Sequence, residues 1–376
     1  MKVTIATGLY PPEVGGPATY AKMLEDYLPA EGIEIKIVPF GWVRHYPKII
    51  RHFIYGFKLW RQSASTDCLY ALDPVSVGLP AVYVSRLRKV PLLVRLGGDY
   101  AWEQGRVRFG VKDDLNTFLE NRDTWPLPVK LLAKIQTYVV RNAVKIIVPS
   151  EYLKSVIEKW GIDEDKITVI FSALYPLRVE ASQEQLRQRL EYKYPTIVSA
   201  GRLVPWKGFS ALLDVVNELK EHYPQIVLII VGDGGEKSKL EKKVALLDLT
   251  HHVRFTGPLS KDALGATIKT ADVFVLNTAY EGLSHQILEV MDIGIPIVTT
   301  NAGGNPELIT DGVEGYLVEF NDVNKIAEAI TRVLNHPESK ERIVQSARLK
   351  SKRFVKEEVI KQIAKLLKSI HAGKQN

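Results

Sequence analysis

Short apolar runs alternate with segments of helical periodicity along almost the whole chain. Six runs lie in the first half, at 2–7, 33–40, 67–72, 90–96, 144–150 and 166–171. Five more follow, at 195–201, 225–232, 252–257, 271–277 and 295–300. Nearly unbroken apolar strands that alternate with helices are typical of parallel sheets covered on both faces. Two such series predict an α/β protein with two doubly wound, Rossmann-like domains.

The division between the two series falls where the strand pattern gives way to a polar, charged helical stretch at 172–195. A length of 376 residues suits two domains of ordinary size. We therefore expect a first domain at 1–175 and a second at 176–353. The remaining segment, 354–376, contains an apolar stripe that predicts a docked helix, formed by Val359, Ile363, Leu366 and Leu367.

Composition excludes several classes of protein. No apolar run approaches the roughly 18 residues that a membrane-spanning helix needs. The first residues, MKVTIATGLYPPEVGG, resemble a β-strand and loop more than a cleavable signal peptide. The single cysteine, Cys68, excludes an intrachain disulfide framework and favours a small core residue in a reducing compartment. We expect a cytoplasmic protein, and the absence of any recognisable nucleic-acid module argues against a nucleic-acid partner.

The positive charge is concentrated in one part of the chain. Residues 36–112 carry 13 lysines and arginines against 4 acidic residues, a balance of +9, whereas the whole chain has a net charge of +7. Within this span, residues 42–61 mix Arg44, Lys48, Arg51 and Lys58 with aromatic residues at near-helical spacing. A basic amphipathic helix of this kind can bind an anionic membrane surface, or it can pack its aromatics on the core and leave a solvated basic face. The sequence leaves both open.

Two loops that follow predicted strands carry features suited to a phosphate. Ligands of open parallel sheets bind at the carboxyl ends of the strands, so these loops are where a site is expected. After the first strand, Gly15 and Gly16 remove side chains from a turn just before a helix, which can bring backbone amides to an anion or simply make a tight turn. After the first strand of the second half, GRLVPWKG contains Arg202 and Lys207, two cations that suit a diphosphate.

A third loop, VGDGGEKSKLE at 231–241, is rich in glycine but is not a Walker sequence. Glu236 stands where that pattern needs glycine before the lysine. We expect Gly232 and Gly234 to let a nucleoside lie against the backbone.

A fourth loop begins the stretch EGLSHQILE, with glutamates at 281 and 289. Glu281 and Gly282 are expected to begin a turn and SHQILEVM, at 284–291, to form a helix, so the amides of residues 282–285 would point at an anion. Eight residues are a little over two helical turns, so Glu281 and Glu289 are predicted to face one ligand. One carboxylate can accept hydrogen bonds from sugar hydroxyls and the other from ribose hydroxyls.

Together, GRLVPWKG, VGDG, FTG and EGLSHQILEVMDIGIPIVTTNAGGNPELI strongly resemble the donor-binding half of retaining glycosyltransferases of family 4, with the E-x7-E motif at Glu281 and Glu289. PPEVGGPATY resembles the N-terminal glycine loop of that family. The resemblance implies the GT-B fold: two Rossmann-like domains that face each other across a cleft, with a C-terminal helix that crosses back to the first domain. It covers most of the chain.

The resemblance also implies roles. The second domain would bind a UDP-, GDP- or ADP-sugar donor, the first a glycan or lipid-linked acceptor, and no metal or other cofactor would be required. Arg202 and Lys207 would hold the diphosphate, Glu289 the ribose, and Glu281 the donor sugar. The other donor-binding residues implied are Gly15, Gly16, Gly232, Gly234, Gly257, Gly282, Leu283 and Ser284. The activity expected is hexosyl transfer in cell-envelope polysaccharide or glycolipid synthesis, by a cytoplasmic or peripheral inner-membrane enzyme.

The chain departs from the family near the reacting sugar. Many members carry a histidine where this chain has RLGGDYAWE, with Asp99 after two glycines. Asp99 can accept a hydrogen bond from a sugar or take the acceptor's proton, with Glu103 a weaker substitute, or it can cap a turn. The run DED at 163–165 imitates a metal motif but is expected to be a turn. A silent sugar-nucleotide-binding protein and a nucleotide-sugar epimerase of similar fold remain alternatives.

Overall fold

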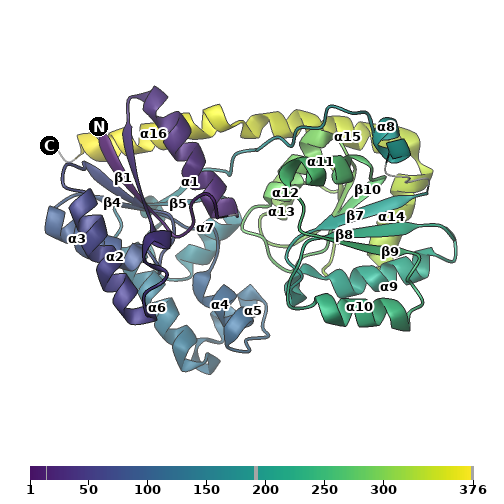
Figure 1. Ribbon diagram of the computed structural model, residues 1–376, viewed down its shortest axis with the longest axis horizontal. Coiled ribbons are helices and arrows are strands. Elements are labelled where there is room, and N and C mark those ends of the chain that lie inside the picture. Colours follow the sequence, from purple (N-terminus) through teal and green to yellow (C-terminus); the bar gives the residue numbers. More distant parts are fainter. Residues whose placement is uncertain (14, 190–193, 374–376) are drawn as a thin grey trace. The chain divides into compact units, whose positions relative to one another are not determined.

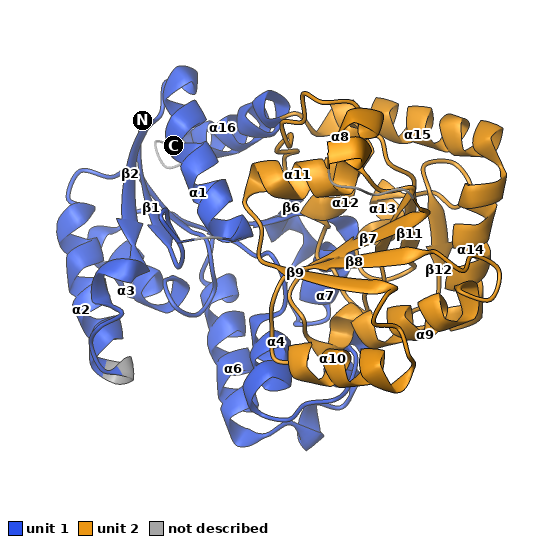
Figure 2. Ribbon diagram, turned by 45° about the vertical axis from the view of Figure 1, so that its right-hand side comes forward, with its two compact units in different colours: residues 1–172, 356–376 blue, residues 173–355 orange. Residues whose placement is uncertain are grey.

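The computed structural model describes residues 1–13, 15–189 and 194–373, apart from the side chains of Lys48 and Ile49. The chain divides into two compact units (Figure 2). Unit 1 consists of residues 1–172 and 356–376, and unit 2 of residues 173–355.

Unit 1 contains a six-stranded sheet in the order β2-β1-β3-β4-β5-β6. Every adjacent pair of its strands is parallel. The strands are β1 (Lys2–Thr7), β2 (Glu34–Pro39), β3 (Cys68–Ala71), β4 (Leu92–Arg95), β5 (Lys145–Val148) and β6 (Ile167–Val169). Strands β3 and β4 are buried along their whole length, as expected for a sheet covered on both faces.

Helices cover both faces of this sheet (Figure 1). They are α1 (Gly16–Tyr27), α2 (Lys48–Gln62), α3 (Gly78–Arg88), α4 (Tyr100–Arg108), α5 (Leu115–Glu120), α6 (Leu127–Arg141), α7 (Glu151–Glu158) and α16 (Lys356–Ala372). Helices α2 and α3 pack together, as do α4 and α6, while α16 packs on α1. In the apolar stripe of α16, Val359, Ile363 and Leu367 are buried and Leu366 is half-buried, so this distant segment completes the first unit.

Unit 2 contains a second six-stranded parallel sheet, in the order β12-β11-β10-β7-β8-β9. Its strands are β7 (Thr196–Ala200), β8 (Val227–Val231), β9 (Val253–Gly257), β10 (Val273–Leu276), β11 (Ile297–Thr300) and β12 (Tyr316–Val318). Each of the eleven apolar runs in the sequence contains one strand of the two sheets. The twelfth strand, β12, escaped prediction because it has only three residues, all half-exposed, at the edge of the sheet.

Helices also cover both faces of the second sheet (Figures 1 and 2). They are α8 (Gln183–Arg189), α9 (Phe209–Leu219), α10 (Lys237–Leu246), α11 (Lys261–Lys269), α12 (His285–Ile293), α13 (Asn305–Leu308), α14 (Val323–Asn335) and α15 (Pro337–Ser351). Helices α9, α10 and α14 share a core with the sheet through residues such as Leu213, Leu240 and Ile330. Helices α11 and α15 pack against α12. The two doubly wound α/β units predicted from the sequence are therefore confirmed.

In the parts of the chain that the structure describes, no helix combines the length and the apolar character needed to cross a bilayer.

Candidate functional site

The loops at the carboxyl ends of β7 and β10 are joined into one cluster in unit 2. The two strands are neighbours, so their loops leave the sheet side by side. The backbone carbonyl of Trp206, in the first loop, accepts hydrogen bonds from the Ala279 amide at 2.8 Å and the Thr278 hydroxyl at 3.3 Å in the second. Asn277 donates to the carbonyl of Gly208 at 2.9 Å. These bonds hold residues 205–208 against residues 277–281.

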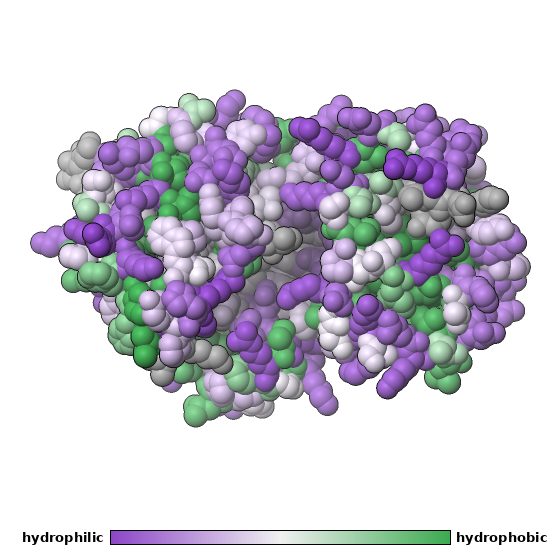
Figure 3. Space-filling view, in the orientation of Figure 1, coloured by the Kyte–Doolittle hydropathy of each residue, from purple (hydrophilic) through white to green (hydrophobic). Residues whose placement is uncertain are grey.

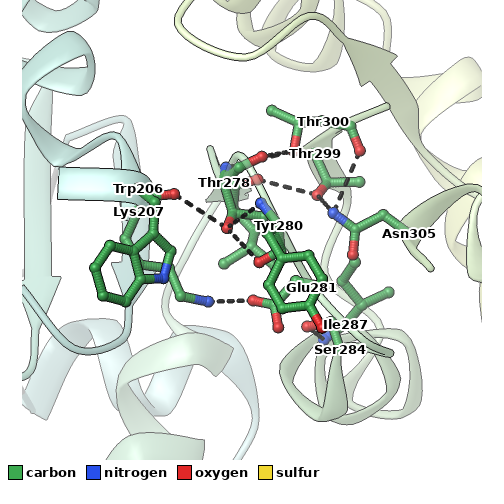
Figure 4. A network of polar contacts seen from close by, with 11 residues as sticks. Trp206, Lys207, Thr278, Tyr280, Glu281, Ser284, Ile287, Thr299, Thr300 and Asn305 are labelled. Atoms are coloured by element: carbon green, nitrogen blue, oxygen red, sulfur yellow. Dashed lines mark hydrogen bonds and ion pairs between the residues drawn. The ribbon is translucent and has the colours of Figure 1, made fainter. Parts of the chain in front are cut away.

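The cluster brings Lys207 and Glu281 into an ion pair (Figure 4). The Lys207 ammonium contacts Oε1 of Glu281, and the two side chains are only 14% and 19% exposed. Lys207 lies on a short 3-10 helix, Pro205–Lys207, which ends at Gly208 in the left-handed conformation. Two of the charged residues predicted for donor binding are thus adjacent, although 74 residues separate them in the chain.

A buried polar network lies behind this ion pair, and the sequence reasoning missed it (Figure 4). The hydroxyl of Thr300 donates to the carbonyl of Thr278 at 2.5 Å, and that of Thr299 donates to the carbonyl of Leu276 at 3.0 Å. The Asn305 amide donates to both Thr299 and Thr300. The signal that could have revealed it is the cluster of threonines and asparagines at the ends of the strands, in LNTAY and VTTNAGGN. The network fixes the backbone that carries Glu281.

Three glycines allow neighbouring loop backbones to approach closely. A Cβ at Gly303, where φ is +60°, would lie 2.0 Å from the carbonyl oxygen of Glu281. A Cβ at Gly232 would lie 1.9 Å from the carbonyl oxygen of Gly201, and one at Gly234 would lie 2.4 Å from that of Leu203. Gly232 and Gly234 were predicted to make room for a nucleoside. In the structure their missing side chains make room for the loop that carries Arg202.

Helix α12 begins at His285, one residue after the start of the helical segment predicted at 284–291. The hydroxyl of Ser284 accepts from the amide of Ile287 at 3.3 Å, which makes Ser284 the N-cap and His285 the first helical residue. Gly282 and Leu283 are buried in the turn before the helix. The N-terminus of α12 thus follows Glu281 after the turn 282–284, and the backbone amides at this N-terminus can donate to an anion.

Glu289 lies on α12 and is half-buried. Burial raises the pKa of its carboxyl to about 7, and the positive charge of Lys261 opposes the rise. A neighbouring ligand hydroxyl that donates to the carboxylate would offset part of its lost hydration. This is a carboxyl group whose charge changes near neutral pH, as expected of a functional position.

The other predicted donor residues lie on the loops of the same sheet. Arg202 is exposed, two residues after β7. Gly257 ends β9, and its carbonyl accepts from the amide of Gly232 at 3.0 Å. Among the residues with described positions, no cluster of three or more His, Cys, Asp or Glu side chains is placed to hold a metal ion. The acidic run 163–165 forms a short turn in which Glu164 pairs with Lys154.

The predicted residues of unit 1 follow strands of its own sheet. Gly15 is the N-cap of α1, with φ +147°, and Gly16 is the first residue of that helix. Asp99 is fully buried and caps α4: its Oδ1 accepts from the Trp102 amide at 3.0 Å and from Gln136 Nε2 at 3.1 Å. Burial raises the pKa of Asp99. Glu103 lies in the first turn of α4. Asp99 therefore caps the N-terminus of helix α4.

Comparison with known proteins gives a match over most of unit 2. Residues 182–350 match the family model Glycosyl transferases group 1. A GDP-mannose-dependent alpha-(1-6)-phosphatidylinositol monomannoside mannosyltransferase of Mycolicibacterium smegmatis is 32% identical over 169 residues, which cover 42% of this chain and 44% of that protein. The match thus spans less than half of that relative's length. An uncharacterized glycosyltransferase of Methanocaldococcus jannaschii is 25% identical over 93% of both chains.

Solved structures extend the likeness to the whole chain at the level of the fold. HepE of Anabaena in complex with UDP superposes with a TM-score of 0.77 at 20% identity, over 98% of this chain and 100% of that one. Sucrose-phosphate synthase from Thermosynechococcus elongatus superposes with a TM-score of 0.79 at 18% identity, over 99% of both chains. The chain has the GT-B fold, and its residues 182–350 match the Glycosyl transferases group 1 domain.

Proposed function

We propose that this protein is a retaining glycosyltransferase of family 4. It moves a hexose from a nucleotide-diphosphate sugar to a glycan or lipid-linked acceptor, in cell-envelope polysaccharide or glycolipid synthesis. The observation that carries the proposal is the loop cluster of unit 2, where Lys207, Glu281 and the N-terminus of α12 meet at the carboxyl ends of adjacent parallel strands. The curated relative that uses GDP-mannose and the UDP complex of HepE support a sugar-nucleotide donor.

The donor's diphosphate would be held by Arg202, Lys207 and the amides at the start of α12. In the structure Lys207 is paired with Glu281, so a bound diphosphate has to draw the ammonium away from this carboxylate. Glu281 is then free to accept from hydroxyls of the donor sugar, and Glu289 from the ribose. The glycines and small residues of the surrounding loops, including Gly257, Gly282 and Leu283, would let the donor lie against the backbone.

The proposed chemistry needs little from the protein beyond charge stabilisation. The acceptor hydroxyl attacks the anomeric carbon from the face on which the nucleotide leaves, and the bond to the diphosphate oxygen breaks through an oxocarbenium-like state. That oxygen takes the acceptor's proton. Each cation or N–H group that stabilises the departing diphosphate lowers the activation free energy by roughly 3 kcal/mol. Because Arg202 and Lys207 supply positive charge at the diphosphate, we propose that transfer proceeds without a metal ion.

The purified protein should release nucleoside diphosphate from one of the UDP-, GDP- or ADP-sugars, and thermal-shift measurements against the three donor classes should identify which. With an acceptor present, NMR of the product should show the anomeric configuration of the donor, and EDTA should leave the rate unchanged. Inversion of configuration would contradict the retaining mechanism. Binding without hydrolysis or transfer would indicate a silent binding protein, and conversion of the free donor without acceptor would indicate an epimerase.

Nucleotide binding should depend on pH through Glu289. Because the pKa of this buried carboxyl is about 7, it is mostly ionised at pH 8 and mostly protonated at pH 6. The carboxylate offers two strong acceptor oxygens to the ribose hydroxyls, whereas the protonated acid keeps one and turns the other into a donor, so affinity for the nucleoside diphosphate should fall as the pH drops from 8 to 6. Calorimetry at both pH values should show this loss. Glu289→Gln should bind more weakly at pH 8 and lose this part of the dependence. Equal pH profiles in the two proteins would remove Glu289 from the ribose site.

The acceptor side of the proposal involves an anionic membrane surface and helix α2. Three aromatic residues at helical spacing point to solvent on α2: Phe53, Phe57 and Trp60 are 76%, 60% and 40% exposed. Hydrophobic residues are visible on the surface of this part of unit 1 (Figure 3). The core side of the helix carries Tyr55 and Leu59 instead. The aromatics were expected to pack on the core in the simpler interpretation, and that interpretation is wrong for these three.

Several of the cations near these aromatics already contact other groups of unit 1. Arg44 pairs with Glu13 and donates to the carbonyl of Gly8, and Lys58 lies 5.8 Å from the ring centre of Trp42. The side chain of Lys48 lies outside the described part of the chain. Arg51 sits over the ring of Phe40 at 5.5 Å. The exposed aromatics can therefore insert between lipids while the cations near them attract anionic head groups. We propose that the protein is cytoplasmic and binds the inner membrane peripherally.

The triple variant Phe53→Ser, Phe57→Ser, Trp60→Ser should lose most of its binding to vesicles that contain anionic lipid. Each buried aromatic contributes on the order of 1.5–3 kcal/mol, so partitioning should fall at least tenfold. Co-sedimentation measures this, and binding of the wild-type protein should also weaken with salt. The matched control is Leu246→Ser with Leu349→Ser, which removes two leucines of unit 2 that are 83% and 68% exposed. A wild-type protein that stays in the supernatant at low salt would contradict the membrane proposal.

A further inference from the structure

Unit 1 contains a groove of about 440 Å³ along helix α6. Seven of its lining residues lie on α6, from Lys130 to Arg141, a span of about 16 Å along the helix axis. The others come from the segments at 99, 122–125 and 160. All of them belong to unit 1, so the groove does not depend on the donor-binding loops.

Two buried polar atoms of the groove residues have no hydrogen-bond partner within the described structure. The first is Oδ2 of Asp99, whose other oxygen is fully used by the Trp102 amide and Gln136. The second is Nε1 of Trp160, a residue that is 5% exposed. An unsatisfied buried polar group costs about 1–3 kcal/mol, and both of these atoms belong to residues that line the groove. A ligand that can both donate and accept would satisfy both, and a sugar hydroxyl does so.

The remaining lining gives the groove a positive charge and flat apolar faces. Arg122, Lys130, Lys134 and Arg141 outnumber the carboxylates Asp99 and Asp123. Arg122 and Lys130 are held by backbone carbonyls, those of Lys159 and Asp123 respectively, so their positive charges stay at the groove. The rings of Trp125 and Tyr138 provide aromatic surface of the kind that packs against the apolar face of a sugar ring.

We propose that this groove binds a sugar that carries an anionic group, either a phosphate or a carboxylate. The hydroxyls of the ring donate to Oδ2 of Asp99 and accept from Nε1 of Trp160, while the anionic group lies among the lysines and arginines of α6 and its flanking segment. This inference rests on the proposed function in one respect, because that function makes a sugar the expected ligand. The class of ligand that unit 1 would recognise is then an anionic sugar.

Access to the two polar atoms requires side chains to move. Both atoms are closed to solvent in this state. The groove edge, however, contains exposed long side chains, among them Lys134 and Arg141, which change rotamer readily. Binding is therefore expected to include a rearrangement of the groove edge rather than entry into a fully formed pocket.

Calorimetry with the whole protein tests the proposal, using glucose 1-phosphate, glucuronate, glucose and inorganic phosphate as probes. At least one of the two anionic sugars should bind at least tenfold more tightly than glucose or phosphate, and the stronger of the two identifies the anionic group. Asp99→Asn keeps the Oδ1 acceptor that caps α4 and changes only the unpartnered oxygen to an amide, so it should fold and yet bind at least tenfold more weakly. Trp160→Phe removes the other partner and should have a similar effect.

Lys134→Gln should also weaken binding of the anionic sugar but not of glucose. Its matched control is Lys361→Gln, which removes another exposed helical lysine of unit 1 that does not line the groove. Unchanged affinity in folded Asp99→Asn and Trp160→Phe proteins would overturn the proposal. If inorganic phosphate bound as tightly as the anionic sugars, the groove would be a simple anion site and not a sugar site. If no probe bound at millimolar concentration, the proposal would be wrong. Nucleoside diphosphate titrated into the same variants reports on unit 2 separately, so failure here is distinguishable from failure of the proposed function.

Discussion

Replacing Lys207 with methionine should lower the turnover number about a hundredfold, because the departing diphosphate loses a cation held close to it. Lys207 is 14% exposed and lies in a loop fixed by the carbonyl of Trp206, so the fold holds its positive charge beside the other residues of the cluster. The variant also leaves Glu281 without its partner, which should weaken donor binding further through repulsion of the diphosphate. Steady-state kinetics with saturating acceptor measures the loss.

The control is Lys243→Met, which breaks an ion pair with Asp214 elsewhere in unit 2 and should leave turnover nearly unchanged. Lys207→Arg should recover part of the lost rate, since the charge is retained with a different shape. Arg202→Ala should cost at least tenfold, and Glu281→Ala should reduce turnover more than nucleotide affinity. Near-native rates in Lys207→Met or Arg202→Ala would remove that residue from the proposed mechanism.

The substitution Gly303→Ala should lower the turnover number by a factor similar to that of Glu281→Ala, without touching any group that contacts the donor in the proposal. The added Cβ would lie 2.0 Å from the carbonyl oxygen of Glu281, so the backbone that presents this carboxylate has to shift. The amide of Gly304 donates to that same carbonyl at 2.9 Å, and the bond would be strained or lost. Steady-state kinetics measures the loss of turnover, and a thermal melt shows whether the variant folds.

Gly312→Ala is the matched control for that substitution. Gly312 has φ +71°, close to the +60° of Gly303, but a Cβ there would meet nothing within 4 Å. Both variants therefore carry the same backbone penalty, of about 1 kcal/mol, and only Gly303→Ala adds the collision. Equal turnover in the two variants would show that the position of Glu281 does not depend on this close approach.

The parallel sheets could be predicted from sequence because their strands are buried on both faces and so appear as nearly continuous apolar runs. Strand β8, with the sequence VLIIV, is buried at every residue. The three residues of β12 carry no such signal. The proximity of Lys207 and Glu281 also followed from topology, because both were expected after strands whose carboxyl ends lie at one edge of a sheet.

Features that depend on tertiary packing could not be predicted. Residue spacing on α2 gives an amphipathic helix but does not say which of its aromatics face solvent, and the structure buries Tyr55 while it exposes Phe53 and Phe57. The glycines of 231–235 indicated close approach, yet only the folded loops show that Gly232 approaches Gly201. Similarly, the pKa of Glu289 depends on how much of α12 is buried, and the free oxygen of Asp99 becomes evident only when Gln136 is placed.

Helix α16 has a consequence for the order in which the chain can fold during synthesis. Residues 173–355 form one continuous unit, whereas the first unit needs residues 356–372 to cover α1. A ribosome-bound chain that has emerged only as far as Ser172 therefore exposes the apolar surface that Ile360, Ile363 and Leu367 later bury. The second unit can reach its native state on the ribosome before the first is complete. The amino-terminal half, although synthesised earlier, is expected to be the part that depends on chaperones until residues 356–372 have left the ribosome.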